Sequence, residues 1–248
     1  MNNKIQQFKN MVADAKRIVF FGGAGVSTES GIPDFRSADG LYRKDFDDIL
    51  PVEKILSVGG LYSYPELFFK FYKEKLACNN AKPNITHIKL AELEKAGKLT
   101  AIVTQNIDGL HQKAGSKNVL ELHGTLMINY CQACYYEYWI DDMLKLMEKS
   151  ENFIPYCKCG GIVRPDIILF GQYLCSDIVA LAKKEVASAD LLIVGGTSLK
   201  VYPAAGFIEH RSETCNLVII NKDPTSQDFN ADLVLNEKLG EVFGALDV

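Results

Sequence analysis

The chain has 248 residues, 48% of them apolar and 23% charged, with a formal net charge of −4. These values fit a globular protein built as one large domain, or as one domain that carries a smaller insertion. The mildly acidic net charge gives no sign of the basic surface that binds nucleic acid. The longest apolar runs, such as Ile167–Phe170, are too short to span a bilayer. Because the first ten residues contain no apolar signal core, we expect a cytoplasmic protein with no membrane or nucleic-acid partner.

Hydrophobic spacing predicts helices and strands that alternate along most of the chain. The expected helices cover residues 2–16, 83–97, 176–188 and 203–210, and the expected strands cover residues 17–21, 99–104, 119–122, 190–194, 216–220 and 231–235. Strands that alternate with helices form a parallel sheet with helices on both faces. The predicted fold class is therefore α/β, with a Rossmann-like parallel sheet.

Two segments depart from this alternation. Residues 40–80 are rich in aromatic side chains and are predicted to form a helical module, whereas residues 126–166 hold four of the seven cysteines. We expect both segments to be insertions that make a smaller domain. The Rossmann-like domain then comprises residues 1–39, 81–125 and 167–248, and the metal-binding module comprises residues 126–166.

Polar or glycine-rich loops follow four of the predicted strands. The sequences are GGAGVS after the first strand, TQNID after the strand at 99–104, GGTSLKVYP after the strand at 190–194, and NKDPT after the strand at 216–220. In an open parallel sheet, ligands bind outside the carboxyl ends of the strands. The four loops are therefore expected to meet in one crevice.

The first of these loops begins like a dinucleotide-binding turn and then departs from it. Gly23-Ala24-Gly25 allows a close approach of phosphate to the backbone, but Thr28 stands where the usual fingerprint has a third glycine. The following segment, Pro33-Asp34-Phe35-Arg36, is not typical of an enzyme that transfers hydride to or from NAD. Arg36 offers a guanidinium fork for phosphate or ribose oxygens, and Phe35 offers a ring face that can exclude water from a reactive sugar carbon.

Four cysteines occur as two close pairs, Cys131-x2-Cys134 and Cys157-x-Cys159, separated by 22 residues. Four thiolates form the closed tetrahedral zinc site that organises a small domain, and they leave no open position for catalysis. A structural zinc ion is therefore predicted. The remaining cysteines, Cys78, Cys175 and Cys215, are expected to be ordinary buried residues.

His123 lies just after the strand at 119–122, at the predicted mouth of the crevice. A histidine titrates near neutral pH, and we interpret His123 as a general base. The other histidines have different expected roles. His87 is expected to be structural, His111 to fix the turn in which it lies, and His210 to be an exposed helix end.

These motifs in this order resemble those of the sirtuins, a family of NAD-dependent protein-lysine deacylases. The resemblance runs from about Ile18 to Val248 and includes GAGVSTESGIPDFRS, TQNIDGLHQKAG, ELHG, the two cysteine pairs, FGQ and GTSLKVYPA. It implies that NAD is a co-substrate whose glycosidic bond is cut. It also implies acetylated-lysine proteins as partners, and we expect a monomer.

The resemblance further implies roles for individual residues. The implied NAD-binding residues are Gly23, Ala24, Gly25, Thr28, Asp34, Phe35 and Arg36, then Gln105, Asn106, Ile107 and Asp108, and finally Gly196, Thr197, Ser198 and Asn221. The implied catalytic residues are His123, Asn106 and Asp108, with His123 accepting a proton from the ribose hydroxyls after nicotinamide has left. The substrate peptide is expected to lie as an added strand between two segments, through Phe170, Gly171, Gln172, Leu199 and Val201.

The sequence departs from the sirtuin pattern at two places. The second cysteine pair is C-x-C where C-x2-C is commoner, and Gln172 stands where glutamate is usual. The neutral amide removes a negative charge beside the peptide groove and puts a preference for basic flanking residues in doubt. Three other functions stay open at this point: mono-ADP-ribosyl transfer at the same site, a conventional NAD dehydrogenase, and a zinc-ribbon interaction module.

Overall fold

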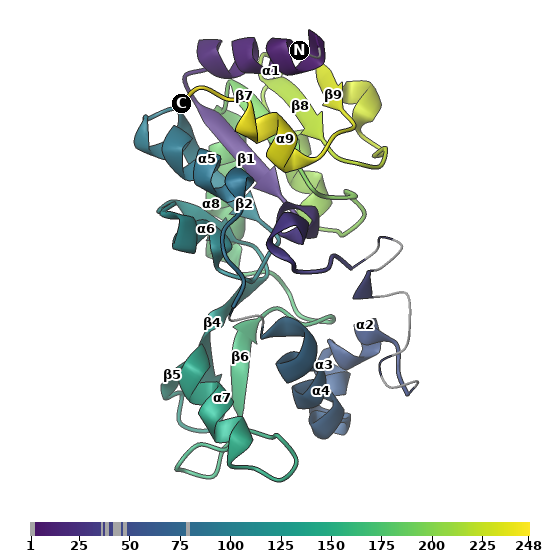
Figure 1. The fold of residues 1–248 in the computed structure, drawn as a ribbon. Helices are drawn as coiled ribbons and strands as arrows, with labels where there is room; N and C mark the ends of the chain where they lie inside the picture. Colours follow the sequence, from purple (N-terminus) through teal and green to yellow (C-terminus); the bar gives the residue numbers. More distant parts are fainter. Residues whose placement is uncertain (1–2, 36, 38–39, 42–45, 47–48, 78–79) are drawn as a thin grey trace.

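The structure is a computed structural model, and it describes residues 3–35, 37, 40–41, 46, 49–77 and 80–248. Arg36 and Cys78, which the sequence singled out, lie outside the described residues. The chain forms two lobes, and both termini lie at the far end of the larger one (Figure 1). The large lobe holds a six-stranded sheet, and the small lobe holds a three-stranded sheet.

The sheet of the large lobe is parallel throughout, in the order β3-β2-β1-β7-β8-β9. Its strands are β1 (Ile18–Gly22), β2 (Leu99–Thr104), β3 (Val119–Glu121), β7 (Leu191–Gly195), β8 (Asn216–Ile220) and β9 (Leu233–Leu235). From β1 the chain builds the sheet outward to one side through β2 and β3, and then to the other side through β7, β8 and β9. The boundary between β1 and β7 is therefore the topological switch point, where a crevice forms at the carboxyl ends of the strands. The predicted Rossmann-like parallel sheet is confirmed.

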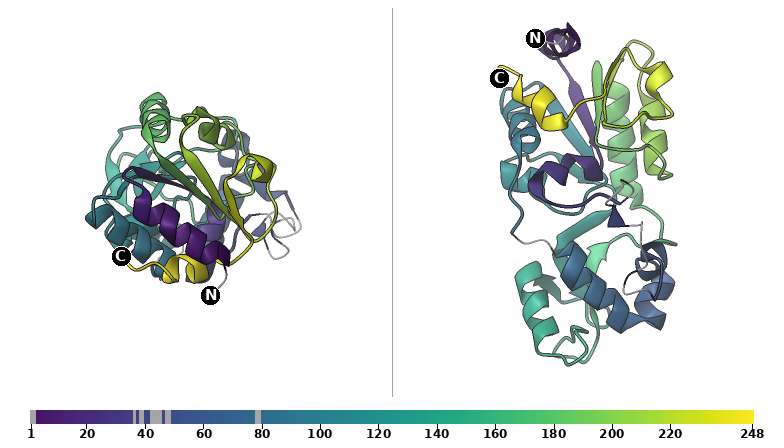
Figure 2. Two further views of the ribbon diagram at one scale, coloured as in Figure 1. Left: turned by 90° about the horizontal axis from the view of Figure 1, so that it is seen from above. Right: turned by 45° about the vertical axis from the view of Figure 1, so that its right-hand side comes forward.

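Helices cover both faces of this sheet because successive side chains of a buried strand point to opposite sides. Ile18 and Phe20 of β1 pack against α1 (Asn3–Asp14), α5 (Ile85–Lys95) and α9 (Leu239–Gly244). Val19 and Phe21 pack against α8 (Ser176–Ser188) and the 3-10 helix η5 (Ala204–His210). The right-hand view of Figure 2 shows the strands between these two layers.

The small lobe combines two separate stretches of sequence. The first supplies α2 (Val52–Ile55), α3 (Val58–Ser63), α4 (Pro65–Phe71) and a π-helical turn η4 (Tyr72–Leu76). The second supplies β4 (Gly124–Cys131), β5 (Glu137–Trp139), α7 (Ile140–Glu148) and β6 (Val163–Ile167), with the antiparallel strand order β5-β4-β6. The buried aromatic residues of α4 and η4 form one core with Met143, Met147 and Val163, so the two stretches fold as a unit.

Four further short helices were not predicted or were predicted only as loops: η1 (Ala24–Val26), η2 (Thr28–Ser30), α6 (Leu110–Ala114) and η6 (Asp228–Asn230). Helix α9 also lies outside the predicted elements. Among the described residues, no helix is both long enough and apolar enough to cross a membrane. The division of the chain into domains at the expected boundaries stays a prediction.

The two lobes are joined where the large sheet ends and the small sheet begins. Strand β3 ends at Glu121 and β4 starts at Gly124, so only Leu122 and His123 lie between the two sheets. Directly beside this junction, the backbone N–H of Ile168 donates to the carbonyl oxygen of His123 at 2.9 Å. The fold thus places His123 at the border between the lobes.

Candidate functional site

A cavity of about 990 Å³ lies at the carboxyl ends of the large-lobe strands, facing the small lobe. Most residues singled out from the sequence line this cavity. From the first loop they are Gly23, Ala24, Gly25, Thr28, Asp34 and Phe35; from the following loops they are Gln105, Asn106, Ile107, Asp108, His123, Gly196, Thr197, Ser198 and Asn221. The expected convergence of four loops in one crevice is therefore observed.

Two glycines let the first and third loops touch. The N–H of Gly25 donates to the carbonyl oxygen of Gly196 at 2.8 Å, and a Cβ on Gly25 would lie 2.8 Å from the Cα of Gly196. Gly196 itself has φ of +60°, and a Cβ there would collide with the backbone nitrogen of Val26. Glycine is required at both positions because a Cβ on either residue would collide with the backbone of the other loop and separate the two loops.

A buried hydroxyl links the first loop to the second. The Oγ of Ser27 donates to Oδ2 of Asp108 at 2.6 Å, and Nδ2 of Asn106 donates to the same Oγ at 3.1 Å. Oδ1 of Asp108 accepts from the N–H of Leu110 at 2.9 Å. Ser27 is only 1% exposed and was not singled out from the sequence, where a serine after glycine looks like an ordinary turn residue. Its position shows how Asn106 and Asp108 are held at the cavity wall.

Behind this wall lies a pair of buried histidines. His87 belongs to the N-terminal capping box of α5, where its Nδ1 accepts from the N–H of Asn84 at 3.3 Å. The ring of His111, on α6, lies 4.7 Å from that of His87 between centroids. Burial lowers the pKa of His87 to about 4 and that of His111 to about 3, so both imidazoles are neutral near pH 7.

Asn84 also connects the histidine pair to the first loop. Its Nδ2 donates to the carbonyl oxygen of Val26 at 2.8 Å and to Oγ of Ser30 at 3.0 Å. The expected structural role of His87 is consistent with this network, as is the expected role of His111 in fixing its turn. His210 is exposed at the end of η5, as expected.

His123 is oriented for proton acceptance. Its Nδ1 lies 3.0 Å from the carbonyl oxygen of Gln105, and because a carbonyl only accepts, Nδ1 carries the proton of the neutral ring. The lone pair is therefore on Nε2. Burial lowers the pKa of His123, and the hydrogen bond to Gln105 opposes this shift. A neutral imidazole with an available lone pair is the form that a general base needs.

The two segments expected to bind a peptide border the same cavity. Phe170, Gly171, Gln172 and Val201 line it, whereas Leu199 is 4% exposed and packs into the core under α8 and η5. Phe170 pairs through its backbone with Leu56 and Val58 of the small lobe. Gly171 makes no backbone hydrogen bond within the described part of the chain, so its N–H and C=O are open to an added strand.

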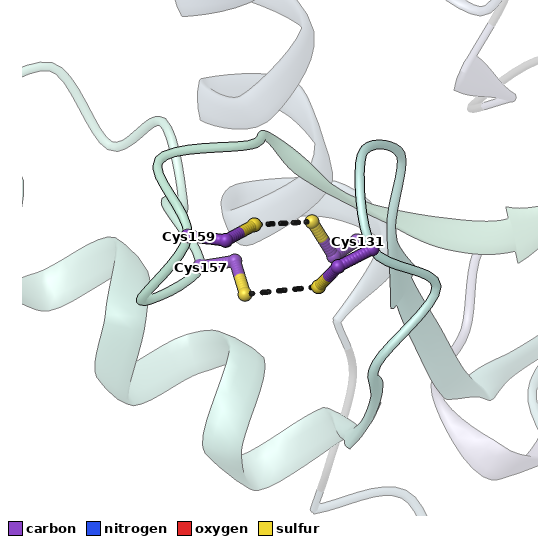
Figure 3. Close-up of side chains that lie close together, drawn as sticks. Cys131, Cys157 and Cys159 are labelled. Carbon is purple, nitrogen blue, oxygen red and sulfur yellow. Dashed lines mark hydrogen bonds between the residues drawn. The ribbon is translucent and has the colours of Figure 1, made fainter.

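The four paired cysteines meet in the small lobe, and Figure 3 shows the side chains of Cys131, Cys157 and Cys159 in this cluster. Their sulfur atoms all lie within 4.8 Å of one another, with separations of 3.5 Å for Cys131–Cys159 and 3.6 Å for Cys134–Cys157. Sulfurs on a tetrahedral zinc ion are about 3.8 Å apart, given Zn–S bonds of about 2.3 Å, so the set fits zinc. A Cβ on Gly161 would lie 2.7 Å from Sγ of Cys131, which makes glycine part of this cradle.

Polar neighbours support thiolates at this cluster. The hydroxyl of Tyr138 donates to Sγ of Cys157 at 3.1 Å, and the N–H of Ala133 donates to Sγ of Cys131 at 3.4 Å. Outside the cluster, Cys215 is buried as expected. The expectation for Cys175 is wrong, because this residue is exposed. It lies directly before α8, a few residues after the segment Phe170–Gln172 that is expected to bind the peptide.

The fold and the site define a class of protein: an α/β nucleotide-binding protein with a cleft between lobes and a separate four-thiol metal module. Comparison with known proteins identifies the family. The sequence profile of the Sir2 family matches residues 23–203, and the chain belongs to this family. The resemblance to sirtuins seen in the sequence is thereby confirmed.

Two relatives and two solved structures show how close the similarity is. The NAD-dependent protein deacetylase of Clostridium perfringens is 52% identical and that of Clostridium acetobutylicum is 51% identical, over 98% and 97% of this chain and 98% and 96% of the relatives. A structure of Sir2 with a deacetylated p53 peptide and 3'-O-acetyl ADP ribose has a TM-score of 0.89, and one of Sir2 with a p53 peptide and NAD+ has 0.86. Both are 38% identical to this chain and cover 97% of it and 96% of their own chains.

Proposed function

We propose that this protein removes acetyl groups from protein lysine side chains with consumption of NAD, and that it yields nicotinamide, O-acetyl-ADP-ribose and free lysine. Membership of the Sir2 family and the deacetylase names of relatives about half identical over nearly the whole chain support this function. Sir2 structures that hold NAD+ or acetylated and propionylated peptides support the cofactor and the substrate class.

The cofactors are NAD as co-substrate and zinc as a structural ion. When bound, NAD supplies the leaving nicotinamide and the ADP-ribose that accepts the acetyl group. Gly25 and Gly196 keep the first and third loops in contact, and these loops would present backbone N–H groups to the phosphates at the cavity floor. Asn106 and Asp108, held by Ser27, would face the nicotinamide end of the cavity with fixed side chains.

The observation that carries the proposal is the geometry of His123. Its Nδ1 proton is tied to Gln105, its Nε2 is free to accept a proton, and its ring lines the cavity beside Asn106 and Ile107. His123 would accept a proton from a ribose hydroxyl after nicotinamide has left. It is therefore needed for transfer of the acetyl group and not for cleavage of the glycosidic bond.

The substrate peptide would add a strand at Gly171, opposite the segment that contains Val201. Main-chain hydrogen bonds give such a strand affinity with little dependence on its sequence. The zinc ion would bind Cys131, Cys134, Cys157 and Cys159 and stabilise the small lobe. It would take no part in the reaction, because four thiolates fill its coordination sphere.

The test is a comparison of two rates in His123→Ala. Loss of a general base lowers a rate by about 10²–10⁴-fold, and this loss should fall on deacetylation. Exchange of labelled nicotinamide into NAD, in the presence of acetylated peptide, should persist at a much higher relative level. His210→Ala, which changes an exposed histidine, is the matched control. Equal loss of both rates, together with a lowered Tm, would show that His123 only supports the fold.

A further inference from the structure

Gln172, which lines the peptide side of the cavity, contacts a buried cation whose hydrogen-bond acceptors are all neutral. Arg164 of β6 is 6% exposed. The Nε atom of Arg164 donates to the carbonyl oxygen of Pro165 at 3.1 Å. Its Nη2 atom donates both to the carbonyl oxygen of Ile167 at 2.6 Å and to Oε1 of Gln172 at 3.3 Å. Burial of a guanidinium strengthens its field, because less water screens the charge.

No carboxylate lies within ion-pair distance of Arg164 in the part of the chain that the structure describes. Arg164 forms no ion pair there, although Asp166 lies two residues along the same strand. The side-chain oxygen that reaches Arg164 from the cavity rim belongs to Gln172, which also accepts from the N–H of Leu169 at 2.9 Å. A neutral amide therefore occupies the place at which a carboxylate would cancel the charge.

The opposite segment of the peptide groove also carries a cation. Lys200 lines the cavity, is exposed, and forms no ion pair with a described residue. The two segments that would bracket the peptide, residues 167–175 and 197–206, contain no aspartate or glutamate. A peptide between them would lie beside the exposed Lys200 and would be separated from the buried Arg164 by the side chain of Gln172.

We propose that the groove selects acetyl-lysine sites with acidic side chains beside the acetyl-lysine, and that the neutral amide of Gln172 sets this preference by leaving Arg164 uncompensated. This inference rests on the proposed deacetylase function and deepens it by naming the substrate class. Charges of opposite sign increase both the association rate and the affinity of a flexible peptide, and salt weakens the effect.

The experiment uses three acetyl-lysine peptides that are identical except for the residues on both sides of the acetyl-lysine, which are Glu, Gln or Lys. The expected order of kcat/KM is Glu above Gln above Lys. At low salt the Glu and Lys peptides should differ by about tenfold, and near 0.15 M salt this ratio should shrink to a few-fold. Fluorescence anisotropy of the same peptides should give the same order of affinities, independently of turnover.

Gln172→Glu tests the role of the amide directly. The new carboxylate has nearly the same shape and should pair with Arg164, so the ratio between Glu and Lys peptides should fall to about one or below. Lys200→Gln should lower the ratio as well, and it keeps the test valid if Gln172→Glu folds poorly. Gln7→Glu adds the same charge on the exposed face of α1, in the large lobe, and should leave the ratio unchanged.

The outcomes separate the two proposals. Equal kcat/KM and equal affinity for the Glu and Lys peptides, in an enzyme that deacetylates the Gln peptide, would overturn the charge preference alone. An unchanged ratio in Gln172→Glu would overturn the role of Gln172. The deacetylase function itself fails if no peptide of the set loses its acetyl group in the presence of NAD, and the affinities then still decide whether the groove prefers acidic peptides.

Discussion

Mild acid should destabilise the protein through the buried pair His87 and His111. Burial lowers both pKa values in the folded chain, to about 4 and about 3, from the ordinary value near 6.5. A group with a lowered folded pKa contributes stability that is complete above the unfolded pKa and is lost as pH falls. Between about pH 7 and about pH 5 the two histidines of the unfolded chain take up about one and a half protons that the folded chain refuses, which lowers the free energy of unfolding by about 4 kcal/mol.

Glu121 acts in the opposite direction. Desolvation raises its pKa to about 7, and the charges of Asp108 and Asp166 add to this shift. An acid with a raised folded pKa contributes stability that is present at low pH and is lost as pH rises towards the folded pKa. On going from about pH 7 to about pH 5, protonation of Glu121 should return about 2 kcal/mol, so these three groups together lose about 2 kcal/mol, and His123, whose pKa is also lowered by burial, adds to the loss.

The assay is urea unfolding of the wild type and Glu121→Gln near pH 7 and near pH 5. The amide removes the titration of Glu121 but not that of the histidines, so the variant should lose about 2 kcal/mol more than the wild type between the two pH values. Glu137→Gln, at an exposed position, should behave like the wild type. The reasoning is refuted if Glu121→Gln and the wild type lose the same free energy, or if the wild type becomes more stable near pH 5.

Three further outcomes are expected. Cys157→Ala should release zinc and unfold the small lobe with a loss of several kcal/mol, and a variant that retains its full zinc content in metal analysis would contradict the ligand assignment. The enzyme should prefer acetyl-lysine to succinyl-lysine, because Phe68–Lys75 near the cavity holds no arginine to bind a carboxylate through a bidentate fork; a larger kcat/KM for succinyl-lysine on the same peptide would argue against this. Nicotinamide should be released without reduced cofactor, and NADH absorbance appearing at enzymatic rates would restore the dehydrogenase hypothesis.

The large lobe was predictable because its central strands are buried apolar runs. The runs at Ile18–Gly22 and Leu191–Gly195 are bounded by glycines and polar loops, and Asn216–Ile220 and Ser176–Ser188 were predicted to the residue. The small-lobe strands were not predicted. Strand β5 has three residues and no buried member, so its position depends on pairing with β4 and on the cysteine cluster rather than on local pattern.

The site was predictable as a set of loops but not as a network. Strand ends reveal where Gln105–Asp108 and Gly196–Ser198 must lie, because parallel strands finish at one edge of the sheet. The bonds from Ser27 to Asp108, 81 residues apart, and from Gln172 to Arg164 join side chains whose approach is decided by tertiary packing. No spacing in the sequence carries that information.

The most direct test of the central claim is mass spectrometry of all products after incubation of the protein with NAD and an acetyl-lysine peptide. The account predicts free lysine, nicotinamide and O-acetyl-ADP-ribose in equal amounts, with no acetate released at the same rate and no ADP-ribose attached to peptide or protein. Equal formation of free acetate and ADP-ribose, or transfer of ADP-ribose to protein without loss of the acetyl group, would contradict it.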